Sequence, residues 1–255
     1  MKSVNVFGIP ISKVTKKEAV DIIISWVTED RKEYMVSPNL DNIVKLIHSN
    51  KFREAYKNAS LIVPDGMPLI WTSQIFGTPL TERVSGADLI LPILKSAEQH
   101  KMSVFFVGSD TNTLLLACSN ILKLYPSIQI LGSHAPSMGF EKNQEEIEQI
   151  LQIINMARPD ILFIGLGAPK QEILVFENKE RLIAHAIIPI GAGIEFIAGT
   201  KSRAPLFLQK IGLEWFWRLI KEPKRLWLRY LNCILWIPIL FYYQYRYRGM
   251  RLPIR

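Results

Sequence analysis

The chain has 255 residues, with 31 Lys or Arg, 23 Asp or Glu and 49% hydrophobic residues. This length and composition fit one α/β domain, alone or with an appendage. A chain of this length can bury a sizeable core. Two cysteines without metal-ligand spacing and an N-terminus without an apolar leader argue against a metal-binding or secreted protein. We therefore expect a reducing, cytosolic compartment.

The charge is distributed unevenly. Residues 201–255 hold 12 basic and 2 acidic residues, a net charge of +10. The remaining 19 basic and 21 acidic residues leave residues 1–200 at −2. A basic end on a nearly neutral body favours an anionic partner, either a lipid surface or a nucleic acid.

Short β-rich runs recur along the chain, at residues 4–9, 33–37, 60–64, 103–108, 128–132, 161–165 and 186–191. Several are apolar on both faces, as buried parallel strands are. Helix starts are expected after Thr15, Ser85 and Asn143, each followed three residues later by an acid that can reciprocate the cap. The alternation predicts an α/β fold with a Rossmann-like, doubly wound, mainly parallel sheet over residues 1–200.

The loops after the expected strands are polar and small. In a doubly wound sheet, ligands bind beyond the carboxyl ends of the strands, where these loops enter helices. The loops in question are residues 37–41, 64–68, 108–110, 132–134, 165–172 and 191–195. Candidate functional side chains are therefore expected in these segments.

The segment G-L-G-A-P-K-Q-E begins at Gly165 and follows an apolar strand. Glycines and helix-start amides in this setting can bind an anion. Lys170 stands where a dinucleotide fingerprint has its third glycine, so that fingerprint is only weakly matched. An anion site and a tight turn without a ligand both remain open.

Asp65 lies between a proline and a glycine in V-P-D-G-M-P. Pro-Asp-Gly is an ordinary turn sequence, because each residue suits the bend. At the carboxyl end of a strand, however, a partly desolvated aspartate has a raised pKa and can act as a general base. The residues alone leave both interpretations open.

Other motifs are excluded by spacing. The segment starting at Gly193 does not match a phosphate-binding loop, because Thr200 is inserted before Lys201. The four histidines are far apart, and no D-x-D occurs. We therefore expect no metal site.

Residues 201–255 form a helical, basic and aromatic appendage in our interpretation. The longest run without charge, residues 230–245, has 16 residues and contains Pro238, which is short for a membrane span. A helix lying in the bilayer interface fits better, with a deeper insertion or an oligomer contact as alternatives. Its basic residues include Arg218, Arg225 and Arg229.

Seven segments in order resemble the WecG/TagA/CpsF family of bacterial glycosyltransferases, which build cell-surface polysaccharides. They are S-P-N-L-D, V-P-D-G-M-P-L-I-W, E-R-V-S-G-A-D-L, V-G-S, G-L-G-A-P-K-Q-E, F-I-A-G-T-K-S-R-A-P and G-L-E-W-F-W-R-L-I-K-E-P-K-R. The match runs from about residue 4 to residue 230. Residues after about 232 go beyond the family's shared core.

The resemblance implies an inverting transfer from a UDP-sugar to a polyprenyl-diphosphate-linked sugar, without a required metal or other cofactor. N-acetylmannosamine is the expected sugar, with its uronic acid or glucose as alternatives. The product belongs to a cell-surface polysaccharide such as teichoic acid, enterobacterial common antigen or exopolysaccharide. The implied location is the cytoplasmic face of the membrane, peripherally bound, and a homo-oligomer is possible.

The resemblance also implies roles for individual residues. Asp65 matches the proposed base, and Ser37 and Asn39 match polar residues of the same pocket. The implied donor or UDP-binding residues are Arg83, Gly108, Gly165, Gly167, Lys170, Gln171 and Glu195. Arg218, Arg225 and Arg229 are expected to meet the diphosphate or the membrane. Serine at 37 and glutamate at 195 differ from the residues more usual in the family.

Two functions of other classes remain as alternatives. The aromatic and basic tail could stack and bind nucleic acid, although its continuous apolar filling suits lipid better. A non-catalytic nucleotide-sugar sensor would share the same sheet.

Overall fold

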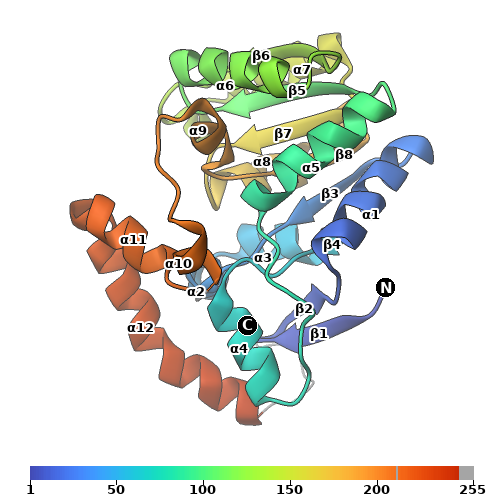
Figure 1. Cartoon of the computed structure of the whole chain (residues 1–255). Coiled ribbons are helices and arrows are strands. Elements are labelled where there is room, and N and C mark those ends of the chain that lie inside the picture. Colours follow the sequence, from blue (N-terminus) through green and yellow to red (C-terminus); the bar gives the residue numbers. More distant parts are fainter. Residues whose placement is uncertain (211, 247–255) are drawn as a thin grey trace.

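The computed structural model describes residues 1–210 and 212–246, and in this part the main sheet has six strands, all parallel (Figure 1). Their order is β4-β3-β8-β7-β5-β6. The strands are β3 (Glu33–Val36), β4 (Leu61–Ile62), β5 (Ser103–Gly108), β6 (Gln129–His134), β7 (Ile161–Gly165) and β8 (Ala186–Pro189). The predicted α/β, Rossmann-like class with a mainly parallel sheet is confirmed.

The centre of the sheet is buried on both faces. Every residue of β5 and β7 is buried, as continuous apolar runs require in a parallel sheet. Phe106 and Phe163 stack across these two strands with ring centroids 5.1 Å apart. This rigid centre fixes the positions of the loops that follow β5, β7 and β8.

Helices cover both faces of the sheet (Figure 1). One face packs against α1 (Lys16–Thr28), α5 (Gly86–Gln99), α6 (Thr111–Leu124) and α9 (Gly193–Ala198). The other packs against α2 (Leu40–His48), α3 (Asn50–Lys57), α7 (Gln144–Ala157) and α8 (Lys170–Asn178). The sheet domain also contains α4 (Met67–Ile75) and the short 3-10 helix η1 (Phe140–Lys142).

The three expected N-caps are confirmed, but only one is a complete capping box. Thr15 and Glu18 exchange both bonds at the start of α1. Ser85 caps α5, yet the carboxylate of Asp88 turns away toward arginines. Asn143 caps α7, while Glu146 accepts hydrogen bonds from Ser137. The expected reciprocation fails at these two positions because stronger or additional donors compete for the carboxylate.

The expected strand at residues 4–9 does not join the main sheet. It forms β1 (Ser3–Val6), which pairs antiparallel with β2 (Ile9–Ser12) in a separate hairpin. Val6 faces Ile9, and the two turn residues Phe7 and Gly8 both have positive φ. Two-residue turns of this kind match the twist of an antiparallel pair, so local turn geometry decides this element.

The tail folds back onto the domain as α10 (Leu206–Lys210), α11 (Glu214–Lys221) and α12 (Pro223–Arg246) (Figure 1). Near its end, Gln244 accepts a hydrogen bond from Phe7 N and donates one to Asn5 O. Earlier in α12, Arg229 pairs with Asp41 of α2 at 2.7 Å. One face of α12 is thus docked at both ends. The expected appendage, residues 201–255, includes residues 211 and 247–255, which lie outside the described residues.

By length and composition, α12 is the one helix of the described residues that could cross a membrane, with a mean hydropathy of 1.2. Within its most apolar window, 17% of the residues are buried. The exposed side chains include Trp227, Leu228, Leu231, Ile234, Leu235, Ile239, Tyr242 and Tyr245. The helix therefore presents a long apolar face to its surroundings.

We expect Gly108→Ala to reduce the free energy of unfolding more than Gly139→Ala does. Both glycines have positive φ, so both variants strain the backbone. A Cβ at Gly108 would also lie 2.3 Å from Gly165 O, whereas nothing lies within 4 Å of one at Gly139. The additional loss should be about 1–3 kcal/mol, measured by urea denaturation. Equal losses would show that β5 and β7 do not need this close approach.

Candidate active site

Asp65 follows β4 at the carboxyl end of the sheet. Its backbone N–H donates to Pro38 O at 2.9 Å, which joins the loop after β4 to the loop after β3. Gly66 has φ of +115° and precedes α4, so the loop turns sharply at the glycine. The side chain of Asp65 retains 28% exposure. The turn interpretation and the interpretation as an accessible carboxylate at a strand end are therefore compatible.

The loop after β3 brings Asn39 beside the Asp65 loop. A Cβ built on Gly66 would lie 3.8 Å from Asn39 Cβ. Asn39 Oδ1 accepts from Asn42 N at 3.0 Å and caps α2. Its Nδ2 is the remaining polar group that it can offer a ligand. Ser37 lies two residues earlier in the same loop and is half-buried.

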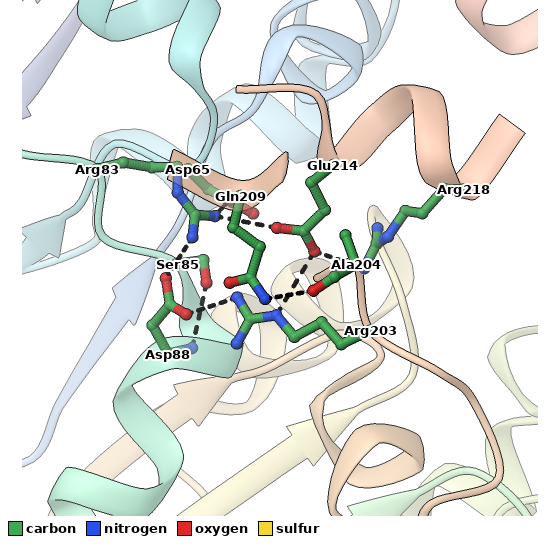
Figure 2. A network of polar contacts seen from close by, with 9 residues as sticks. All are labelled: Asp65, Arg83, Ser85, Asp88, Arg203, Ala204, Gln209, Glu214 and Arg218. Atoms are coloured by element: carbon green, nitrogen blue, oxygen red, sulfur yellow. Dashed lines mark hydrogen bonds and ion pairs between the residues drawn. The ribbon is translucent and has the colours of Figure 1, made fainter. Parts of the chain in front are cut away.

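Arg83 connects Asp65 to two further carboxylates (Figure 2). Its guanidinium nitrogens lie 3.7 Å from Asp65 Oδ1, 2.9 Å from Asp88 Oδ2 and 3.5 Å from Glu214 Oε2. Arg83 enters from the segment before α5, Asp88 from the first turn of α5 and Glu214 from the start of α11. The cluster therefore joins the sheet domain to the tail.

Arg203 and Arg218 approach the same Glu214 carboxylate from the tail (Figure 2). Arg203 Nε lies 3.6 Å from Glu214 Oε1, and Arg218 Nη2 lies 3.9 Å from it. Arg203 also pairs with Asp88. Both guanidiniums lie over the Phe196 ring, at 5.7 and 5.4 Å from its centroid. Glu214 thus places one carboxylate among three guanidiniums, and a substrate phosphate binding there would have to compete with it.

The environment shifts the two aspartates in opposite directions. Burial raises the pKa of Asp65 to about 6, and Glu214 adds to the increase while Arg83 opposes it. For Asp88, burial acts to raise the pKa, but Arg83 and Arg203 outweigh it and hold the pKa below its usual value. Asp88 is therefore the permanently ionised anchor. Asp65 is the group that gains and loses a proton near neutral pH.

The glycines after β5 and β7 have a packing role. A Cβ at Gly165 would lie 2.7 Å from Ile194 Cδ1 and 2.9 Å from Gly191 O. Gly108 approaches Gly165 in the same way from the neighbouring strand. Gly167 has a positive φ and open space around a built Cβ. Close backbone approach explains Gly108 and Gly165, and their predicted contact with UDP stays a prediction.

Three other predicted donor residues have partners of their own. Gln171 is buried, and its Oε1 accepts from Gly167 N and Gly191 N. Lys170 pairs with Glu141 at 2.8 Å. Glu195 pairs with Lys201 through Oε1 at 3.4 Å, while its Oε2 is buried without a hydrogen-bond partner among the described residues. Of the three, Glu195 retains an acceptor for a ligand, and Gln171 already binds the loops.

A groove between α9 and the tail helices lies beside this cluster, lined mainly by Phe196, Lys201, Trp217, Arg218, Lys221 and Arg225. Arg225 is exposed and pairs with Glu222. Arg229 lies instead against Asp41, where it anchors α12 to α2. The predicted roles of these arginines toward a diphosphate or a membrane stay predictions, and Arg229 gains an anchoring contact that the sequence did not indicate.

Sequence reasoning missed Asp88, Arg203 and Glu214. In the sequence, Asp88 is already explained as the acid three residues after the N-cap residue Ser85, so nothing there suggests a further role. Arg203 and Glu214 stand inside the motifs T-K-S-R-A-P and G-L-E-W, but nothing in their spacing points to Asp65. Among the described residues, no group of three or more His, Cys, Asp or Glu side chains could hold a metal ion.

Comparison with known proteins finds a matching family model and named relatives. Residues 4–251 match the family model described as the glycosyl transferase WecG/TagA/CpsF family. A similar protein from Bacillus spizizenii is named N-acetylglucosaminyldiphosphoundecaprenol N-acetyl-beta-D-mannosaminyltransferase. It is 27% identical over 208 residues, covering 82% of this chain and 78% of the relative. A protein of the same name from Staphylococcus aureus strain MW2 is 25% identical over 225 residues, covering 88% and 86%.

We expect Glu214→Gln to lower the pKa of Asp65 below about 6. Loss of the Glu214 charge removes a repulsion that raises this pKa and leaves Arg83 with one fewer competing anion. The measurement is a pH titration of the Asp65 carboxyl carbon by NMR. Glu222→Gln is the control, because Glu222 lies in the same tail and pairs with Arg225. A pKa unchanged or raised in Glu214→Gln would contradict the proposed coupling.

Proposed function

The chain belongs to the WecG/TagA/CpsF family of glycosyltransferases, and we propose that it transfers N-acetylmannosamine from UDP-N-acetylmannosamine to N-acetylglucosamine on a polyprenyl diphosphate. The names of the relatives from Bacillus spizizenii and Staphylococcus aureus support this sugar and this acceptor. The product linkage in those names is β. This supports inversion at the sugar's C1 when the bond between the donor sugar and UDP is α. Their acceptors, which are lipid intermediates, support a place at a membrane, and we propose its cytoplasmic face.

The observation that carries the proposal is the position of Asp65. Its carboxylate lies at the carboxyl end of β4, partly exposed, with a pKa of about 6. Such a group is mostly ionised at neutral pH and is a stronger base than an ordinary aspartate. Arg83, which lies 3.7 Å away, holds the carboxylate in place.

The proposed reaction breaks one bond and forms another. An acceptor hydroxyl oxygen attacks C1 of the donor sugar while its proton passes to Asp65. The bond between C1 and the phosphate oxygen breaks, and UDP leaves with the electron pair. The guanidiniums of Arg203 and Arg218, close to Asp65 through Glu214, stabilise the leaving diphosphate. That UDP leaves without a metal ion to stabilise its charge stays a prediction.

Membrane attachment is proposed to occur through the apolar face of α12 together with α11. Trp215, Phe216 and Ile220 of α11 are exposed, as are the leucines of α12 at positions 228, 231 and 235. This apolar area suits insertion into the bilayer interface, with the neighbouring lysines and arginines facing lipid phosphates. Family membership gives the chain an enzyme's function, which leaves the nucleic-acid-binding and sensor alternatives unsupported.

The donor alternatives are separated by the product. UDP-N-acetylmannosamine, UDP-N-acetylmannosaminuronic acid and UDP-glucose would be offered with a short-chain prenyl-diphosphate N-acetylglucosamine acceptor. Mass spectrometry of the product identifies which sugar is added. Addition of only the uronic acid or only glucose would replace the proposed donor while keeping the reaction class.

We expect Asp65→Asn to lower kcat by about 10²–10⁴, because the acceptor hydroxyl loses its base. UDP binding, measured calorimetrically, should be retained. Unchanged turnover would remove Asp65 from the mechanism.

The same variant should gain stability relative to the wild type as the pH rises. The folded-state pKa of Asp65, about 6, lies above its usual value of 3.8, so the contribution of this group to the stability of the wild type is fully present below pH 3.8 and is lost as pH rises through 6. Asparagine does not ionise. The free energy of unfolding of Asp65→Asn minus that of the wild type should be about 1–3 kcal/mol larger at pH 8 than at pH 4. If Asp65→Asn were less stable relative to the wild type at pH 8 than at pH 4, the lost turnover would instead be explained by misfolding of the variant.

We expect Leu228→Ser with Leu235→Ser to weaken binding to phosphatidylglycerol-containing vesicles at least tenfold, because two leucines no longer insert. Co-sedimentation measures the binding. The matched control replaces Leu115 and Leu116 of α6, which are also exposed but belong to the sheet domain. Equal binding by the two double variants would place the membrane contact elsewhere.

A further inference from the structure

A buried carboxyl group lies outside the Asp65 cluster, at Glu172 in the first turn of α8. The side chain is 1% exposed. Its Oε1 accepts from Gln171 Nε2 at 2.9 Å, and its Oε2 has no hydrogen-bond partner among the described residues. Burying a carboxyl group with so little hydrogen bonding costs free energy, so its place here calls for a reason.

The neighbouring glutamine joins two loops at the carboxyl ends of the strands. Gln171 Oε1 accepts from Gly167 N and from Gly191 N, each at 3.2 Å. Gly167 lies in the loop after β7 and Gly191 in the loop after β8. Both glycines have positive φ, so these turns lie outside the usual backbone conformations. One side-chain carbonyl thus holds two adjacent turns of the predicted donor site together.

Glu172 and the two backbone N–H groups select the same orientation of the Gln171 amide. The two ends of a glutamine amide have nearly the same shape, but one accepts and the other donates. An ionised carboxylate only accepts, so it binds the Nε2 end and leaves Oε1 facing the two backbone N–H groups. In the reversed orientation, two N–H groups would face an NH₂ group and the amide oxygen would face a carboxyl oxygen.

The protonation state of Glu172 does not remove this selection. Burial raises the pKa of Glu172 to about 7, against the opposing hydrogen bond from Gln171. The protonated group still has a carbonyl oxygen that accepts from Nε2. Gln171 is therefore oriented on both sides of neutral pH.

We propose that Glu172 is a positioning residue for the donor's nucleoside diphosphate, acting through Gln171 on the loops after β7 and β8. The inference rests on the proposed function in one respect, that a UDP-sugar binds at these loops. Correctly turned loops direct their other amides and the start of α8 toward the diphosphate. Loops released from Gln171 lose that arrangement, so the donor binds more weakly while the acceptor side is unaffected.

The test exchanges the two side chains. Gln171→Glu places two carboxyl groups against each other and should weaken UDP binding at least tenfold, a change of about 1.4 kcal/mol. Glu172→Leu removes the acceptor for Gln171 Nε2 and should weaken UDP binding by at least about threefold. In the double variant, Gln171→Glu with Glu172→Gln, the glutamine amide now at position 172 donates to the carboxylate now at position 171, whose other oxygen again accepts from Gly167 and Gly191. UDP binding should then recover.

Calorimetry measures UDP binding, and steady-state kinetics should show a raised donor KM with a smaller change in kcat for Gln171→Glu. Hydrogen exchange at Gly167 and Gly191 should accelerate in Gln171→Glu and slow again in the double variant. Gln144→Glu is the matched control, because Gln144 also donates to a glutamate, Glu148, but on the exposed face of α7. It should leave UDP binding unchanged.

A double variant that binds UDP no better than Gln171→Glu overturns the proposal. So does UDP affinity that is the same in all variants, even where amide exchange follows the expected order. UDP binding is measured without acceptor or transfer. Failure here therefore leaves the Asp65 chemistry standing, and failure of Asp65→Asn to lose turnover leaves this test intact.

Discussion

Arg83, Arg203 and Arg218 meet Asp65, Asp88 and Glu214 where the sheet ends, and the balance of their charges allows the cluster to be only partly exposed (Figure 2). An unpaired charge in this place would be strongly unfavourable. Each arginine therefore needs its carboxylates, and each carboxylate its arginines. The members come from the loop after β4, the start of α5 and the tail, so the cluster ties the tail to the carboxyl end of the sheet.

The tail is tied to the sheet domain at further points. Arg229 of α12 pairs with Asp41, which is two residues from Asn39 in the loop after β3. Gln244, near the end of α12, binds the backbone of the β1–β2 hairpin. A helix with a long exposed apolar face is thereby connected to the loops around Asp65. The membrane attachment proposed for this face would therefore be linked mechanically to the geometry around Asp65.

Three carboxyl groups near the ends of the strands differ in protonation and in exposure. Asp88 is surrounded by arginines and stays ionised, so it anchors the cations. Burial raises the pKa of Asp65 to about 6 and that of Glu172 to about 7. Asp65 remains partly exposed and can meet a substrate, whereas Glu172 is enclosed and can act only through Gln171. Exposure, rather than pKa, separates the proposed base from the positioning residue.

The sequence by itself determined the class of fold, because continuous apolar runs such as 103–108 and 161–165 can be satisfied only in a sheet covered on both faces. It also located the N-caps and the strand-end loops, since these depend on neighbouring residues, and its ordered motifs indicated the family. Only the tertiary structure decided that Asp88 serves arginines instead of its helix cap, and that Arg203 and Glu214 join Asp65. These outcomes depend on groups more than a hundred residues apart, or on competition between partners, and spacing along a chain carries no information about either.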